Sequence, residues 1–88
     1  MITGTQIRAA RALLGWSQDK LAATSGVSLP TVKRIEARGD ELGGRATTMQ
    51  RIQVALETAG IVFITDDNDG GRGVRFGRRD RSGSSRLA

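Results

Sequence analysis

The chain contains no cysteine, no histidine and only one proline among its 88 residues. Without cysteine and histidine it can form neither a disulfide framework nor a thiol or imidazole zinc site, and it has no histidine general base. Carboxylates are then the only candidates for acid–base catalysis, but they are scattered over predicted helices and loops. We therefore expect no enzyme activity, no metal and no cofactor.

The one acidic stretch, residues 66–69, matches a calcium-binding loop only at its start. Asp66 and Asn68 occupy the first and third positions of such a loop. Gly70 takes the fifth position, however, and Gly77 the twelfth, where a bidentate glutamate is needed. Because Asp, Asn and Gly are typical turn formers, we interpret this stretch as a turn.

Long apolar runs are absent as well. No segment approaches the roughly 20 apolar residues of a membrane span, and the N-terminus lacks the layout of a signal peptide, so we expect a cytoplasmic protein without a membrane partner. A chain of 88 residues is long enough for one small domain. A body of about 60 residues buries only about 60% of the surface of its unfolded chain. A core this small becomes more stable when a second subunit covers part of its apolar surface, so we expect a homodimer.

Charge is unevenly distributed along the chain. Residues 1–69 hold eight basic and eight acidic residues, whereas residues 70–88 hold six arginines and one aspartate, so the net charge of +5 lies in the last nineteen residues. A basic arm of this kind is an electrostatic footprint for polyanions, and a solubilising tail is the alternative. A third interpretation applies to residues 81–88 alone, which resemble an appended, non-native segment.

Two helices are predicted in the first third of the chain. Thr3 and Gln6 have the spacing of a capping box, and the apolar face that follows predicts a helix ending near Gly15. A second, short helix covers about residues 18–25, and Gly26 supplies its left-handed end.

Two further helices follow. Ser28 can cap the third, and Pro30 is tolerated in its first turn because the amides there have no intrahelical acceptor. Thr47 and Gln50 repeat the capping-box spacing at the start of a fourth helix, whose apolar seam ends at Gly60.

After the fourth helix the pattern becomes extended. Residues 61–64 are β-branched and aromatic, and residues 74–76 alternate, which predicts a β-hairpin with a long loop. The predicted fold is mainly α: a four-helix domain over 1–60, a hairpin over 61–77 that makes the dimer contact, and a flexible basic tail over 78–88.

Residues 18–36 carry the strongest pattern, a helix, a glycine turn and a second helix. At 100° per residue, Val32 and Ile35 lie on the buried face of the third helix. The outward face carries Pro30, Lys33, Arg34 and Ala37. A helix in the major groove uses Arg or Lys on guanine edges and apolar groups on thymine methyls. Leu29 flanks this face as a candidate methyl contact, and its alternative is packing against Leu21.

These residues resemble the phage repressor and Cro-like (XRE) helix-turn-helix family, over roughly residues 7–59. Its specific part runs from Leu14-Gly15-Trp16-Ser17-Gln18 through Gly26-Val27-Ser28 to Ile35-Glu36. The whole chain also looks like a subgroup of short bacterial regulators that begin Ile-Thr-Gly and end in an Ala-Gly-(apolar)-Phe-Ile segment and a Gly-Val-Arg segment. Two departures are Ser25, usually apolar, and Ala37-Arg38-Gly39 in place of an Asn-Gly helix end.

The resemblance implies that residues 1–60 form a compact, lambda-repressor-like helix-turn-helix domain of four helices that binds operator DNA as a dimer, with the third helix in the major groove. It places Gln18 on a phosphate and Arg38 and Arg45 near the flanking backbone. It also implies a buried pair between Arg11 and Glu36, and two unconnected surface charges are the alternative. The expected DNA-binding residues are Gln18, Ser28, Leu29, Pro30, Thr31, Lys33, Arg34, Arg38, Arg45 and Thr47.

We interpret the chain as a sequence-specific DNA-binding transcription regulator, a repressor that acts as a homodimer on a palindromic operator. An exposed apolar strand invites pairing. The expected dimer contact comprises Ile61, Val62, Phe63, Ile64, Val74 and Phe76. The competing interpretation is a protein-binding module, such as an antitoxin or antiactivator, which would bind a partner protein.

Overall fold

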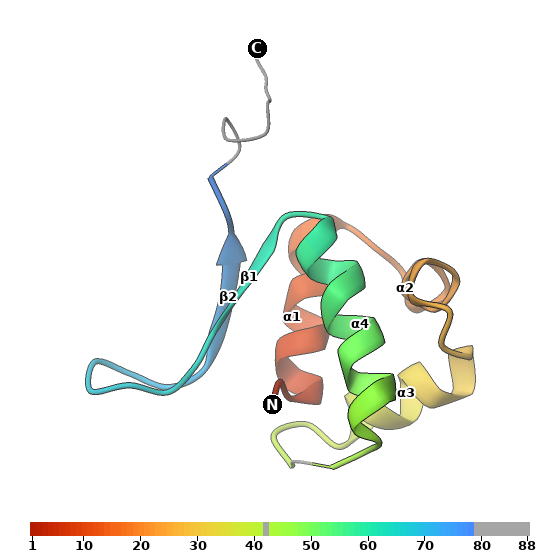
Figure 1. Ribbon diagram of the computed structural model, residues 1–88, viewed down its shortest axis with the longest axis horizontal. Coiled ribbons are helices and arrows are strands. Elements are labelled where there is room, and N and C mark those ends of the chain that lie inside the picture. The colour runs from red at the N-terminus through yellow and green to blue at the C-terminus, as the bar shows by residue number, and fades with distance from the viewer. Residues whose placement is uncertain (42, 79–88) are drawn as a thin grey trace.

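The computed structural model describes residues 1–41 and 43–78. Over these residues the elements are α1 (Gly4–Leu14), α2 (Gln18–Ser25), α3 (Leu29–Ala37), α4 (Ala46–Thr58), β1 (Ile61–Ile64) and β2 (Gly73–Phe76) (Figure 1). The predicted fold, four helices followed by a hairpin, is confirmed. Of the expected basic tail, only residue 78 lies within the described residues.

The first three helices begin and end where the sequence indicates. Thr3 and Gln6 form the reciprocal capping box, and α1 ends at Gly15 in the left-handed conformation. α2 closes at Gly26, again left-handed with φ of 74°. At the start of α3 the side chain of Ser28 accepts a hydrogen bond from the N–H of Thr31, three residues on.

The predicted start of α4 is wrong by two residues. The helix begins at Ala46 with Arg45 as its N-cap, and no side chain caps it. A capping Thr must itself be non-helical, but the N–H of Met49 bonds the carbonyl of Arg45, which places Thr47 inside the first turn. The capping box expected from Thr47 and Gln50 therefore does not form.

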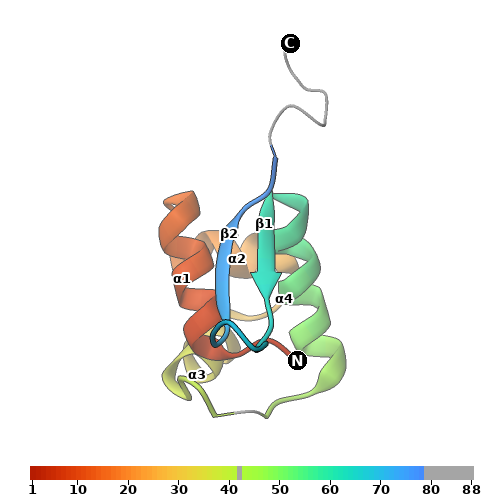
Figure 2. The ribbon, with the colours of Figure 1, turned by 90° about the vertical axis from the view of Figure 1, so that its left-hand side faces the viewer.

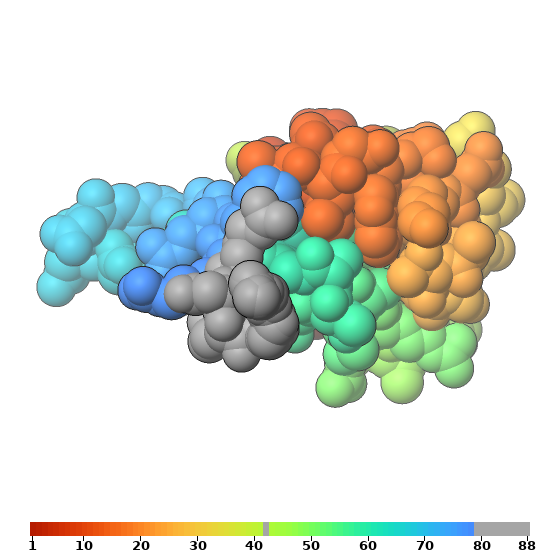
Figure 3. Space-filling view, turned by 90° about the horizontal axis from the view of Figure 1, so that it is seen from above, coloured from red at the N-terminus to blue at the C-terminus, as the bar shows by residue number. Residues whose placement is uncertain are grey.

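The core lies between the helices and one face of the hairpin. Its largest fully buried apolar side chains are Ile7, Leu21, Val32, Ile52 and Leu56. Antiparallel pairing sets Ile61 opposite Phe76 and Phe63 opposite Val74, so these four side chains share one face of the sheet. The hairpin lies across α1 and α4, as Figure 2 shows, and its turn projects beyond the helical body (Figure 3).

The start of α1 docks directly on the end of α3. A Cβ atom at Gly4 would overlap the carbonyl oxygen of Ile35, so only glycine permits this approach. The N–H of Thr5 donates to the carbonyl of Gly39 at 3.1 Å. Because α1 is thereby tied to α3, the orientation of α3 depends on the first residues of the chain. No helix within the described residues has the length and apolar character needed to span a bilayer.

Candidate nucleic-acid interface

The predicted division of α3 into two faces is confirmed. Val32 and Ile35 are buried, 0% and 4% exposed. The outward residues Pro30, Lys33, Arg34 and Ala37 are all exposed. Leu29, at the first helical position, is half-buried. The helix therefore presents two cations and two small apolar groups to solvent.

Three polar side chains are linked along this exposed surface. The Oγ–H of Ser28 donates to Oγ1 of Thr31 at 2.9 Å, and Nη2 of Arg34 donates to the same oxygen at 3.2 Å. Side chains three residues apart are neighbours on a helix surface, which is why this chain of contacts forms.

A cleft of about 410 Å³ separates α3 from the start of α4. Its lining comprises Thr31, Arg34, Ile35, Arg38, Gly44, Arg45 and Thr48, three of them arginines and none acidic. Arg38 reaches into the loop, where its Nη1 would lie 2.9 Å from a Cβ at Gly43. Gly44, Arg45 and Thr48 bring the start of α4 to this cleft, and no side chain caps the helix there, so its positive N-terminal end lies at the cleft.

The structure brings Arg34, Arg38 and Arg45 together, but it places Thr47 elsewhere. Thr47 lines a different groove, between α2 and α4, together with Trp16. Thr48 takes the place in the arginine-lined cleft, and the sequence pattern did not indicate it. The apolar seam of α4 could have indicated Thr48, because Thr48 lies four residues before the buried Ile52 on nearly the same side of the helix, whereas Thr47 is rotated from Thr48 by 100°.

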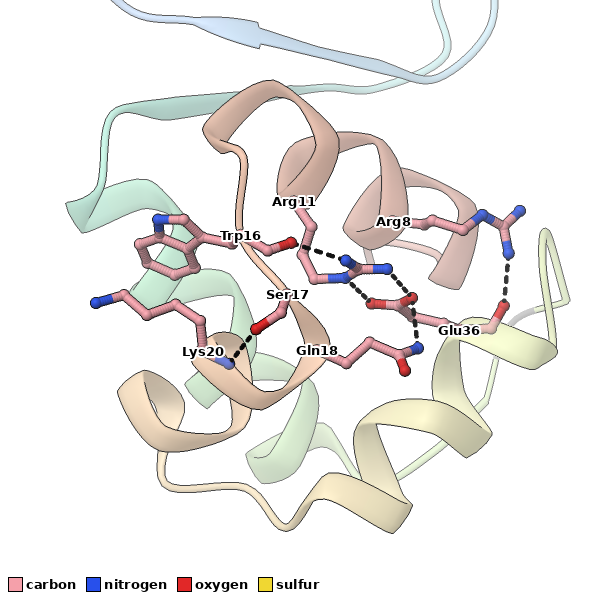
Figure 4. Close-up of polar contacts among 7 residues, drawn as sticks. All are labelled: Arg8, Arg11, Trp16, Ser17, Gln18, Lys20 and Glu36. Carbon is pink, nitrogen blue, oxygen red and sulfur yellow. Dashed lines mark hydrogen bonds and ion pairs between the residues drawn. The ribbon is translucent and has the colours of Figure 1, made fainter.

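Gln18 belongs to a partly buried polar cluster centred on Glu36. Its Nε2 donates to Oε1 of Glu36 at 3.1 Å (Figure 4). Arg11 binds the same carboxylate twice, Nε to Oε2 at 2.7 Å and Nη2 to Oε1 at 2.8 Å. The sequence left two alternatives open, an Arg11–Glu36 pair or two unconnected surface charges. The structure contains the pair.

This cluster joins three elements. Glu36 on α3 has a side chain only 3% exposed, Arg11 comes from α1, and Nη1 of Arg11 also donates to the carbonyl of Trp16 at 2.8 Å, just before α2. The hydrogen bond that Arg11 donates to Glu36 is the main cause that raises the pKa of Arg11, against the opposing effect of burial. The guanidinium is thus held charged, and the pair fixes the position of α3 relative to α1 and α2.

The two departures from the family pattern have local explanations. Ser25 is half-buried, and its hydroxyl donates to the carbonyl of Ala22 and accepts from the N–H of Val27, so its polar group is satisfied. At the end of α3, Arg38 keeps a helical conformation and Gly39 adopts a left-handed φ of 63°. The helix therefore still exits through a glycine.

Comparison with known families identifies this arrangement. A family model described as helix-turn-helix matches residues 7–57, from α1 through α4 and more than half of the chain. The chain belongs to the XRE-type helix-turn-helix family. No curated protein matches it. The family comprises DNA-binding regulators that are generally non-enzymatic, and its domain binds double-stranded DNA. This XRE-type chain is a DNA-binding helix-turn-helix regulator, and the hairpin lies outside the matched region.

Proposed function

We propose that this XRE-type protein is a sequence-specific repressor that binds a palindromic operator as a homodimer, with α3 in the major groove. The observation that carries the proposal is the exposed cationic face of α3, continuous through Arg34 with the arginine-lined cleft beside α4. A base-reading helix flanked by backbone contacts needs this combination, because base contacts specify a sequence and phosphate contacts set the register.

In this proposal Lys33 and Arg34 read bases, and Leu29, Pro30 and Thr31 lie at the same groove. Arg and Lys bind the O6 and N7 acceptors of guanine, and half-buried Leu29 has apolar surface for a thymine methyl. Ser28 stands at the N-terminus of α3, where it faces the groove edge.

In this proposal the remaining predicted residues contact the phosphate backbone of the DNA. Arg38 and Arg45 lie with Thr48 in the cleft, and Thr48 takes the role that the sequence predicts for Thr47. Gln18 reaches a phosphate with its second amide hydrogen, because its hydrogen bond to Glu36 uses only one. The arginines from residue 78 onward add affinity without selecting sequence. Deleting residues 78–88 should therefore lower the salt slope by about 0.9 for each phosphate that the arm neutralises, on specific and random duplexes alike.

The homodimer is proposed to form through the hairpin. Phe76 is 47% exposed, and residues 61–64 and 74 bring further apolar surface to the same two strands. The N–H of Gly77 bonds the carbonyl of Gly60, so the alternation of an antiparallel pair turns the backbone groups of Val74 and Phe76 away from β1. Within residues 1–41 and 43–78 these outward groups bond no other backbone. Such an edge accepts a second strand.

Two-fold symmetry links the dimer to the operator. A symmetric dimer presents two copies of α3 to two half-sites about one helical turn apart, so the operator repeats in inverted orientation. Repression requires only that this site be occupied.

Selection of bound duplexes from a random pool tests the proposal, followed by titration of Arg34→Ala. The pool should converge on an inverted repeat. The variant should lose about 1 to 3 kcal/mol on the selected duplex and little on a scrambled one, while its unfolding free energy changes by less than about 0.5 kcal/mol. Arg51→Ala is the matched control, because it removes another exposed arginine, from α4, outside both the proposed DNA contact and the proposed dimer contact. A pool without any preferred sequence would overturn sequence-specific binding.

A further inference from the structure

We infer that Thr31 is a positioning residue for Arg34: its hydroxyl oxygen holds the guanidinium in place before DNA arrives, and Ser28 fixes that hydroxyl. The inference rests on the proposed function, in which Arg34 reads a base. It assigns to Thr31 a role in specificity that requires no contact between Thr31 and DNA.

The hydrogen-bonding capacity of the three side chains matches this arrangement. A threonine hydroxyl has two acceptor lone pairs and one hydrogen. One lone pair accepts from Oγ of Ser28 at 2.9 Å and the other from Nη2 of Arg34 at 3.2 Å. Ser28 is itself held, because its Oγ accepts the N–H of Thr31 at 3.4 Å in the helix cap. The anchor is therefore part of the N-terminal cap of α3, a fixed backbone feature.

The contact leaves Arg34 free to bind DNA. A guanidinium carries five N–H donors, and Thr31 uses one of them, which leaves enough for a bidentate bond to guanine. Within residues 1–41 and 43–78 no carboxylate pairs with Arg34, since the ion pair found there joins Arg11 to Glu36. Arg34 is thus oriented by a neutral oxygen, and its charge remains available to the nucleic acid.

Orientation matters because a free arginine loses much rotamer freedom when it binds. A side chain already held in its bound geometry loses less on association, so preorganisation raises affinity for the correct base. A wrong base that cannot accept both bonds gains nothing from the same preorganisation. Thr31 therefore acts on specificity through Arg34.

The test is a double-substitution cycle on the duplex selected above and on a scrambled duplex. Thr31→Val keeps the β-branched shape and the backbone N–H but removes the acceptor. It should weaken the selected duplex by about three- to tenfold, the equivalent of one hydrogen bond, and weaken the scrambled duplex by a smaller factor. Thr31→Ser retains the hydroxyl and should restore binding. In an Arg34→Ala background, Thr31→Val should have no further effect.

Three outcomes would overturn the inference. Equal losses from Thr31→Val with and without Arg34 would mean that Thr31 touches DNA directly. If Thr31→Ser binds the selected duplex as weakly as Thr31→Val does, loss of the hydroxyl is not the cause of the weaker binding. Thermal melts of both variants show whether unfolding accounts for the loss of binding instead. If Thr31→Val binds the selected duplex as well as wild type while Arg34→Ala binds it weakly, only this inference is wrong. If Arg34→Ala keeps its specificity, the proposed base reading by Arg34 is wrong as well.

Discussion

The side-chain nitrogen of Gln6 lies 3.0 Å from the carbonyl oxygen of Gly73. The same Nε2 atom donates to the carbonyl of Ile64 at 3.2 Å, while Oε1 accepts the N–H of Thr3 at 3.0 Å. Gln6 is only 5% exposed, so its amide satisfies both a helix start and the loop end of the hairpin, where Ile64 pairs with Gly73, in a place with little water. One buried side chain therefore couples the DNA-binding helices to the proposed dimer element.

Gln6→Glu should destabilise the fold at neutral pH by about 1 to 3 kcal/mol, because it keeps the capping acceptor but points a carboxylate at two carbonyl oxygens. That environment raises the pKa of the introduced carboxyl above its value in the unfolded chain. The deficit should then be small at acid pH, where the protonated group donates, and should grow as the pH rises through the raised pKa. Urea unfolding of variant and wild type at pH 7 and pH 5 measures the difference. Equal stability at pH 7 would contradict the assigned bonds.

Gly4→Ala should cost about 1 to 3 kcal/mol of stability, although alanine is the better helix former by roughly 1 kcal/mol. The new methyl group would overlap the carbonyl oxygen of Ile35, which is backbone and cannot rotate away. Gly70→Ala is the control, because a Cβ there meets nothing within 4 Å. Thermal melts of the two variants should separate clearly, and a Gly4→Ala variant as stable as wild type would show that α1 and α3 can move apart.

The contrast between Thr3 and Thr47 shows what the sequence could predict. Both precede a glutamine by three residues, but only at Thr3 does the chain leave the helix before the cap, and that choice depends on how the α3–α4 loop packs. The two faces of α3 follow from helical periodicity, and the two strands follow from β-branched, aromatic and alternating residues. All were predicted, although β2 begins one residue earlier than expected, at Gly73. The second role of Gln6 was not predictable, since its acceptors lie 58 and 67 residues away. The tight approach at Gly4 is equally non-local.

Removing one partner of the buried pair should be more harmful than removing both. Arg11→Met leaves the carboxylate of Glu36 buried and unpaired, at a cost of about 3 to 5 kcal/mol, whereas Arg11→Met with Glu36→Leu should be less destabilised. Because Glu36 raises the pKa of Arg11, the wild-type contribution is complete below the pKa of arginine in the unfolded chain and is lost only as the pH rises through the raised value. Denaturant titrations should therefore find no loss of this contribution at alkaline pH short of that range. A double variant with a lower free energy of unfolding than Arg11→Met would contradict this account.

The hairpin dimer is best tested at Phe76. Phe63 packs against the core of its own chain, so changing it would mix folding with assembly, whereas Phe76 is 47% exposed. Phe76→Arg places a charge on the edge strand and should give a folded monomer in sedimentation, with operator affinity lower by at least about tenfold because the half-sites are then bound independently. Val54→Arg, at a side chain 50% exposed on α4, is the matched control and should remain a dimer. A dimeric Phe76→Arg variant beside a monomeric Val54→Arg variant would move the subunit contact from the hairpin to α4.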